Sequence, residues 1–176
     1  ELVINEMLPL VGKNGLADYC DVFCEKGAFS SEDTRRILEA AKAYGMRPKV
    51  HAEQLSRSGG VQVGVEVGAL SVDHCEYVSQ ADIVSLAASG ETVATLLPGA
   101  TLFLGMDQWA PGRRLIDAGV PVALSTDCNP GSSNTINIQL MANLGCTQMG
   151  MSVGGEPRCH PHCRSQSPRH SRRGGN

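Results

Sequence analysis

The feature that most constrains the fold is a repeat along residues 19–150, in which short apolar, β-branched segments alternate with amphipathic helical segments. Five strands are expected, at residues 19–23, 47–51, 69–73, 92–97 and 120–126. Strands that are separated by helices run parallel, because a parallel neighbour needs a crossover connection. The repeat therefore predicts an α/β fold with a parallel sheet.

Helices are expected between the strands. Ser30 or Ser31 can cap the first helix, with Glu32 and Asp33 in its first turn and Gly45 just after its end. Further helices are expected near residues 60–67, 79–89, 108–118 and 135–148, the first of these being weaker because glycines interrupt it.

The segment 120–126 is apolar on both alternating faces, which is typical of a strand buried between a barrel interior and an outer helix layer. This favours a partial TIM-type (β/α) barrel, with an open doubly wound sheet as the alternative. Five βα units are fewer than the eight units, in roughly 250 residues, of a full barrel. Residues 1–15 resemble the second half of a helix. We therefore expect residues 1–150 to be part of a larger enzyme.

Charge and cysteine content narrow the class of protein. Residues 1–150 hold 10 basic and 17 acidic residues, an acidic balance that argues against nucleic acid as the main partner. Seven scattered cysteines fit reduced thiols better than secreted disulfides. No apolar run approaches the roughly 18 to 20 residues of a membrane helix, and the N-terminus shows no secretory signal. The chain is expected to be cytoplasmic, to act on a small molecule and not to bind membranes.

Unusual polar residues fall where the expected strands end, which is where catalytic groups cluster in (β/α) barrels. His51, His74 and Asp127 are the main examples. Singly, each histidine can be a hydrogen-bonded structural imidazole, and Asp127 can be a helix cap or turn former. Together they indicate hydrolysis at one divalent metal ion, zinc or ferrous iron, with His51 and Asp127 as ligands and His74 taking a proton from water or holding an oxyanion.

The turn after the fifth expected strand contains Asn129, Gly131 and Ser132. Its amides and hydroxyl can hold a substrate carboxylate, with help from the start of the following helix. On spacing alone, however, a histidine and an aspartate 76 positions apart are not a motif.

Five motifs follow one another along residues 1–150: Asp21-Val-Phe-Cys-Glu25, Lys49-Val-His-Ala-Glu-Gln54, Ser71-Val-Asp-His-Cys-Glu76, Leu96-Leu-Pro-Gly-Ala100 and Ala123-Leu-Ser-Thr-Asp-Cys-Asn-Pro-Gly-Ser132. In these motifs and their order, residues 1–150 resemble the imidazolonepropionases, which are amidohydrolases of histidine degradation. The resemblance implies ring opening of 4-imidazolone-5-propanoate to N-formimidoyl-L-glutamate by metal-activated water. It also implies that the full-length enzyme can form a homodimer.

The resemblance also implies a role for each site residue. His51 and Asp127 would be metal ligands, and His74 the general base or the group that orients water. Gln54 would contact the imidazolone, Asn129 and Gly131 the carboxylate, and Ser132 the substrate ring or chain. The family's metal site also needs a His-x-His pair at the end of the first barrel strand, a segment that has no match in this chain, so the chain alone is expected to be inactive. Two alternatives stay open, another amidohydrolase such as a nucleobase deaminase, and a non-catalytic barrel fragment.

The resemblance stops after Gly150. Residues 151–176 hold 5 basic residues, 1 acidic residue and four hydrophobic ones, too few to bury a core. We expect a disordered basic tail there that results from a shift of reading frame. Cys159-His-Pro-His-Cys163 has the wrong spacing for known zinc modules and is expected to bind metal only adventitiously. A nucleic-acid-binding arm is a weaker alternative for this tail.

Overall fold

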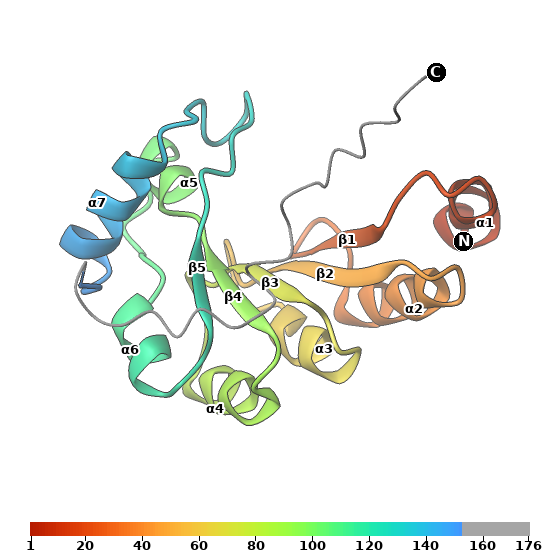
Figure 1. Ribbon diagram of the computed structural model, residues 1–176, viewed down its shortest axis with the longest axis horizontal. Helices are drawn as coiled ribbons and strands as arrows, with labels where there is room; N and C mark the ends of the chain where they lie inside the picture. The colour runs from red at the N-terminus through yellow and green to blue at the C-terminus, as the bar shows by residue number, and fades with distance from the viewer. Residues whose placement is uncertain (153–176) are drawn as a thin grey trace, which may run out of the picture.

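The computed structural model describes residues 1–152, and its centre is one parallel sheet of five strands (Figure 1). The strands lie in the order β1-β2-β3-β4-β5, so each one pairs with its neighbours in sequence. Their bounds are β1 Tyr19–Cys24, β2 Arg47–Ala52, β3 Ser71–His74, β4 Val93–Leu96 and β5 Val122–Leu124. All five predicted strands are therefore confirmed, and β3, β4 and β5 are shorter than predicted.

Helices connect the strands and also precede the first one. The chain starts with a π-helical turn, η1 Val3–Met7, that continues into α1 Leu8–Lys13. The remaining helices are α2 Ser31–Lys42, α3 Gly60–Glu66, α4 Gln80–Ser89, α5 Pro98–Phe103, α6 Gly112–Asp117 and α7 Ile138–Gln148. Ser30 caps α2, since its side-chain oxygen accepts a hydrogen bond from the Asp33 amide at 3.1 Å. Only α5 has no counterpart among the predicted helices.

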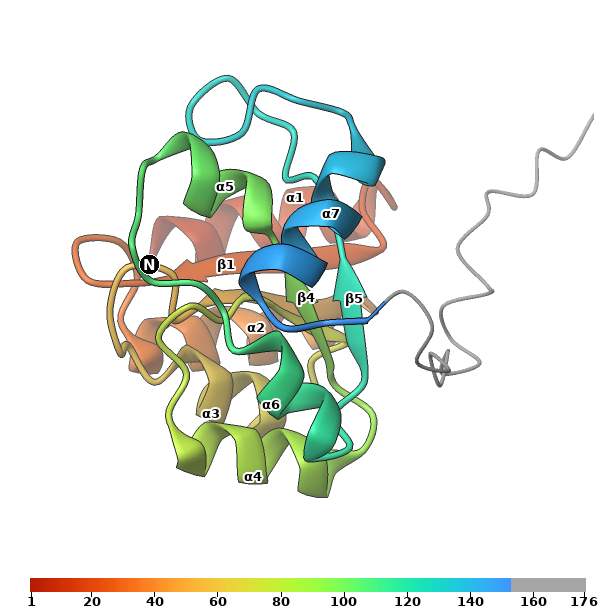
Figure 2. The ribbon, with the colours of Figure 1, turned by 90° about the vertical axis from the view of Figure 1, so that its left-hand side faces the viewer.

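The sheet curves like part of a barrel wall, with α2, α3, α4 and α6 on its convex side (Figures 1 and 2). A doubly wound sheet reverses its strand order and carries helices on both faces. The sequential order of the strands and the position of these helices on one face of the sheet are those of a partial (β/α) barrel, not of a doubly wound sheet. Within residues 1–152 the sheet is not closed, because β1 pairs only with β2 and β5 only with β4.

The core lies between the sheet and its helices. Val50 and Val72 point to that side and are completely buried, together with Leu38 of α2. Gly64 lets α3 approach the sheet closely, because a β-carbon there would lie 2.6 Å from a methyl group of Val72. The concave face carries alternate residues of β1 and β2, including Asp21 and Lys49, which are adjacent in the register.

The expected tail, 151–176, lies outside the described residues except for Met151 and Ser152. Met151 packs against the core, and its amide donates to the Gly145 carbonyl at 3.0 Å. The Cys159 to Cys163 segment is not described. Among residues 1–152, no helix has both the length and the apolar character that crossing a membrane requires.

Candidate functional site

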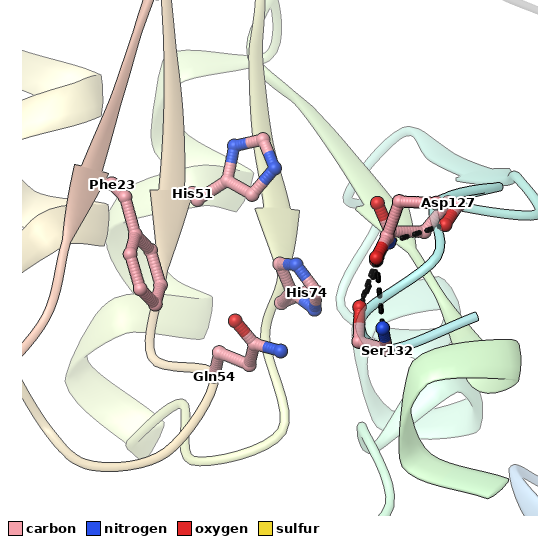
Figure 3. Close-up of a pocket in the computed structure, with 7 residues that line it drawn as sticks. Phe23, His51, Gln54, His74, Asp127 and Ser132 are labelled. Carbon is pink, nitrogen blue, oxygen red and sulfur yellow. Dashed lines mark hydrogen bonds between the residues drawn. The ribbon is translucent and has the colours of Figure 1, made fainter. Parts of the chain in front are cut away.

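The strand ends bring three potential ligands together. His51 lies in β2, His74 ends β3, and Asp127 follows β5. One ligand atom from each of these side chains lies within 4.8 Å of the other two. Figure 3 shows the two histidines on one side of a pocket and Asp127 on the other. Residues that are 76 positions apart in the sequence thus share one site.

An open pocket of ≈ 380 Å³ surrounds this group. It is lined by Phe23, His51, Gln54, His74, Asp127, Asn129 and Ser132. Six of the seven candidate site residues therefore line one pocket. The seventh, Gly131, lies in the same loop as Asn129 and Ser132 but is exposed outside the lining.

His74 reaches the pocket through an unusual backbone conformation. In β3, Asp73 faces the concave side and Val72 the helices, so regular alternation would turn His74 toward the helices as well. Instead, φ is +84° at His74 and +70° at Cys75, in the left-handed region that side chains other than glycine rarely adopt. Among residues 1–152 the only other non-glycine residues with positive φ are Glu53 and Asp127. All four lie at strand ends near the pocket, where strain is typical of functional sites.

His51 is held from the neighbouring strand. Its Nδ1 lies 2.8 Å from Oδ2 of Asp21 in β1. Burial lowers the pKa of the His51 imidazole, but the hydrogen bond with Asp21 and the nearby carboxylates, including Asp73 and Asp127, outweigh this effect and raise it. For Asp21, burial raises the pKa of the carboxyl group. The hydrogen bond with His51 and the charges of His51 and Lys49 outweigh burial, so the pKa of Asp21 is lowered. The pair thus favours its charged forms.

His74 has different surroundings. It is almost completely buried, and its Nδ1 has no hydrogen-bond partner. The nearest carboxylate is Oε1 of Glu76 at 3.7 Å, and that oxygen accepts a hydrogen bond from the Thr101 hydroxyl at 2.9 Å. Glu76 is also buried, and its second oxygen is unpaired. A buried imidazole next to a carboxylate can accept or hold a proton.

The loop after β5 is organised by Asn129. Its side-chain oxygen accepts from the amides of Gly131 and Ser132, both at 2.8 Å. Its side-chain nitrogen donates to the Asp127 carbonyl at 2.7 Å and to the Ser132 hydroxyl at 2.8 Å. The loop amides predicted to hold a carboxylate are therefore engaged within the loop, whereas the side chains of Asn129 and Ser132 line the pocket.

The loop between β2 and α3 is held by two buried carboxylates. Glu53 accepts from the amides of Gly59, Gly60 and Val61 at 2.7, 3.1 and 2.9 Å, at the start of α3. Glu25 accepts from the amides of residues 55 and 56 and from the Ser56 hydroxyl. Gln54, which lies between these anchor points, is thereby placed at the pocket.

The curated proteins that this sequence resembles include imidazolonepropionases. The chain is 51% identical over 151 residues to the enzyme of Geobacillus sp. (strain WCH70), and 56% identical over 142 residues to that of Deinococcus radiodurans. These alignments cover 86% and 81% of the chain. The chain belongs to the imidazolonepropionase family. It spans about a third (35%) of the length of these relatives, and no protein-family model matches it.

Solved structures show the same fold as this chain. An Aspergillus niger (A. niger) ochratoxinase has a TM-score of 0.60 at 18% identity, with 84% of this chain and 39% of that chain covered. A zinc-bound adenosine deaminase from Xanthomonas campestris has a TM-score of 0.59 at 14% identity, with 77% and 34% covered. These likenesses confirm the partial (β/α)-barrel fold.

The residues present fit a divalent metal ion. Two imidazoles and a carboxylate are the nitrogen and oxygen donors that zinc and ferrous iron accept. The site also leaves one side open to a water or a substrate, as a catalytic metal site requires.

Four further polar residues, which the sequence did not indicate as site residues, surround this group. Asp21 contacts His51, Lys49 donates to Asp73 at 2.9 Å, and Glu76 lies beside His74. Alternation along β1 and β2 is the signal that could have found Asp21 and Lys49, because it puts both on the face that carries His51.

Proposed function

We propose that this chain supplies part of the active site for hydrolysis of 4-imidazolone-5-propanoate to N-formimidoyl-L-glutamate. The proposal rests on the convergence of His51, His74 and Asp127 within 4.8 Å at one pocket. Membership of the imidazolonepropionase family supports it. The reaction adds water to the ring carbonyl carbon and breaks that carbon's bond to the ring nitrogen.

His51 and Asp127 would hold one divalent ion, zinc or iron. When bound, the ion would lower the pKa of a water molecule to about 7 and polarise the substrate carbonyl. Asp127 also contacts the Ser132 hydroxyl at 3.4 Å, so the proposed ligand is tied to the loop that faces the substrate.

His74 would move the proton. It lines the pocket and is buried, so the imidazole can take the proton that the attacking water loses. It can then give this proton to the ring nitrogen as the carbon–nitrogen bond breaks. The single product carries an open-chain amidine and a new carboxylic acid. The second proton of the water leaves this acid and protonates the amidine, so the product holds an amidinium and a new carboxylate, and atoms and charge balance.

Gln54, Asn129 and Ser132 would bind the substrate. The amide of Gln54 can donate to and accept from the planar imidazolone. Ser132 lies on the opposite side of the pocket, next to Asp127 (Figure 3). Asn129 also lines the pocket and donates to the Ser132 hydroxyl, so the polar atoms of both side chains would meet the ring or the propanoate. Gly131 would contact the carboxylate after a rearrangement of the loop, because its amide now donates to Asn129.

A chimeric enzyme tests this function. Residues 1–150 would replace the matching segment of the Deinococcus radiodurans imidazolonepropionase, which is 56% identical over 142 residues. The chimera is expected to hydrolyse 4-imidazolone-5-propanoate, and its His51→Ala variant to lose both metal and activity. The isolated 176-residue chain, run in parallel, is expected to be inactive, because the proposed site takes two metal ligands, His51 and Asp127, from the described residues, whereas catalytic zinc sites use three.

A folded, metal-loaded chimera without this hydrolysis would refute the proposal. Guanine, tested as a second substrate, distinguishes the nucleobase-deaminase alternative from the proposed function. Release of ammonia from guanine by the chimera, but not by the parent enzyme, would favour that alternative.

A further inference from the structure

We propose that Asp21 is a positioning residue that fixes the tautomer and the orientation of His51. This inference rests on the proposed function, since it concerns how a proposed metal ligand is held. Asp21 itself lines no part of the pocket, so it would act only through His51.

The geometry of the pair carries the proposal. Asp21 and His51 lie on adjacent parallel strands, and both face the concave side of the sheet. Oδ2 of Asp21 is 2.8 Å from Nδ1 of His51, the distance of a strong hydrogen bond. A carboxylate only accepts, so Nδ1 must carry the proton in the neutral ring. Nε2 then keeps its lone pair for a metal ion.

A second carboxylate, Asp73, could have competed for His51, because it is adjacent in the register on the other side. Lys49 reduces this competition. Its ammonium group donates to Oδ2 of Asp73 at 2.9 Å and holds that oxygen in an ion pair. Oδ1 of Asp73 is buried without a hydrogen-bond partner, and it is Asp21 that makes the 2.8 Å contact with Nδ1 of His51.

His74 provides an internal comparison. Its Nδ1 has no hydrogen-bond partner, and the closest carboxylate oxygen is 3.7 Å away. The two histidines of the site are therefore held differently, His51 with a fixed tautomer and His74 without one. A metal ligand requires a constant lone pair, whereas a group that shuttles a proton must change its protonation state.

Nitrogen NMR of the isotope-labelled 176-residue chain, without metal, gives the direct test. At a pH well above the pKa of His51, the wild-type ring is expected to show only the form protonated at Nδ1. Asp21→Ala should populate the form protonated at Nε2, and so should the isosteric Asp21→Asn, because its amide can donate to a bare Nδ1. The exposed Asp107, changed to alanine, is the matched control and should leave the His51 signals unchanged.

Binding of Co²⁺ by the same four proteins gives a second readout. Loss of a residue that orients a metal-bound histidine costs roughly 10- to 100-fold in affinity. We expect that loss for Asp21→Ala and none for Asp107→Ala. Unfolding temperatures measured alongside show whether each variant is folded.

The two readouts separate the inference from the proposed function. A wild-type His51 without the Nδ1-protonated form, or with the same tautomer in the Asp21 variants, overturns the role of Asp21 whatever the metal result. If the wild-type chain fails to bind Co²⁺, the proposed metal site loses its support. The NMR result still decides the role of Asp21 in that case.

Discussion

The imidazole rings of His51 and His74 lie with their centroids 5.1 Å apart and their planes tilted by 52°. In the register of the sheet, His51 is adjacent to Asp73, not to His74. The left-handed backbone at His74 brings the second ring to the side of the first. The site therefore depends on this backbone conformation as well as on the identity of the side chains.

The first prediction distinguishes the two histidines in the chimeric enzyme described above. His74→Gln is expected to lower kcat by about 10²- to 10⁴-fold, the usual worth of a general base, with metal content unchanged. His51→Gln should lose metal and activity together. Steady-state kinetics with metal analysis of the same samples measures both, and equal metal loss in the two variants would contradict the assignment of His74.

The second prediction concerns Asp127, whose φ is +49°. Asparagine tolerates this conformation, so Asp127→Asn should change the free energy of unfolding by no more than about 0.5 kcal/mol. The β-branched Asp127→Val should cost about 1–3 kcal/mol. Both should weaken Co²⁺ binding. Urea unfolding compares them, and identical stabilities would show that the left-handed conformation is not present in solution.

The third prediction concerns Glu53, which accepts three amide protons at the start of α3. In Glu53→Gln, an NH₂ group faces one of these donors, so we expect a loss of about 1–3 kcal/mol in the free energy of unfolding. The exposed Glu91→Gln is the control and should be neutral. If both variants melt at the wild-type temperature, the hydrogen bonds that Glu53 accepts are not important for stability.

The fourth prediction is a pH dependence that arises from the Asp21–His51 pair. The raised pKa of His51 means that its contribution to stability is complete below about pH 6.5 and is lost as pH rises through the raised value. The lowered pKa of Asp21 means that its contribution is present above about pH 3.9 and is lost as pH falls through the lowered value.

The pair should therefore stabilise the fold most between about pH 4 and pH 6.5. Subtracting the unfolding free energy of Asp21→Asn from that of the wild type, across the pH range, should give a maximum in this window. A difference that does not vary with pH would exclude the pair as its source.

Much of the fold could be predicted because its signals are local. Apolar strands, the cap at Ser30 and the glycine after α2 are each visible within a few residues of sequence. The convergence of His51 and Asp127 follows from one rule, that parallel strands present their carboxyl ends at the same edge. Helix α5 lacked such a signal, because Pro98–Phe103 is short and follows its strand with almost no turn.

Two features of the site could not be predicted from such local signals. The left-handed backbone at His74 depends on the packing of the strand end, since histidine adopts this conformation more often than most residues but still too rarely for its identity to predict it. The Asp21–His51 contact depends on the register between β1 and β2. An offset of one residue would have placed Asp21 on the opposite face from His51.

The unclosed sheet has a consequence for any ion bound by this chain. Along β1 and β5 there is no further strand in residues 1–152 to wall off the concave side, so bulk water reaches the space around His51 laterally. Ligand exchange there would be rapid, and a mild chelator would strip the ion within a dialysis step. Metal content measured after affinity purification would consequently underestimate occupancy, and titration at equilibrium is the appropriate measurement.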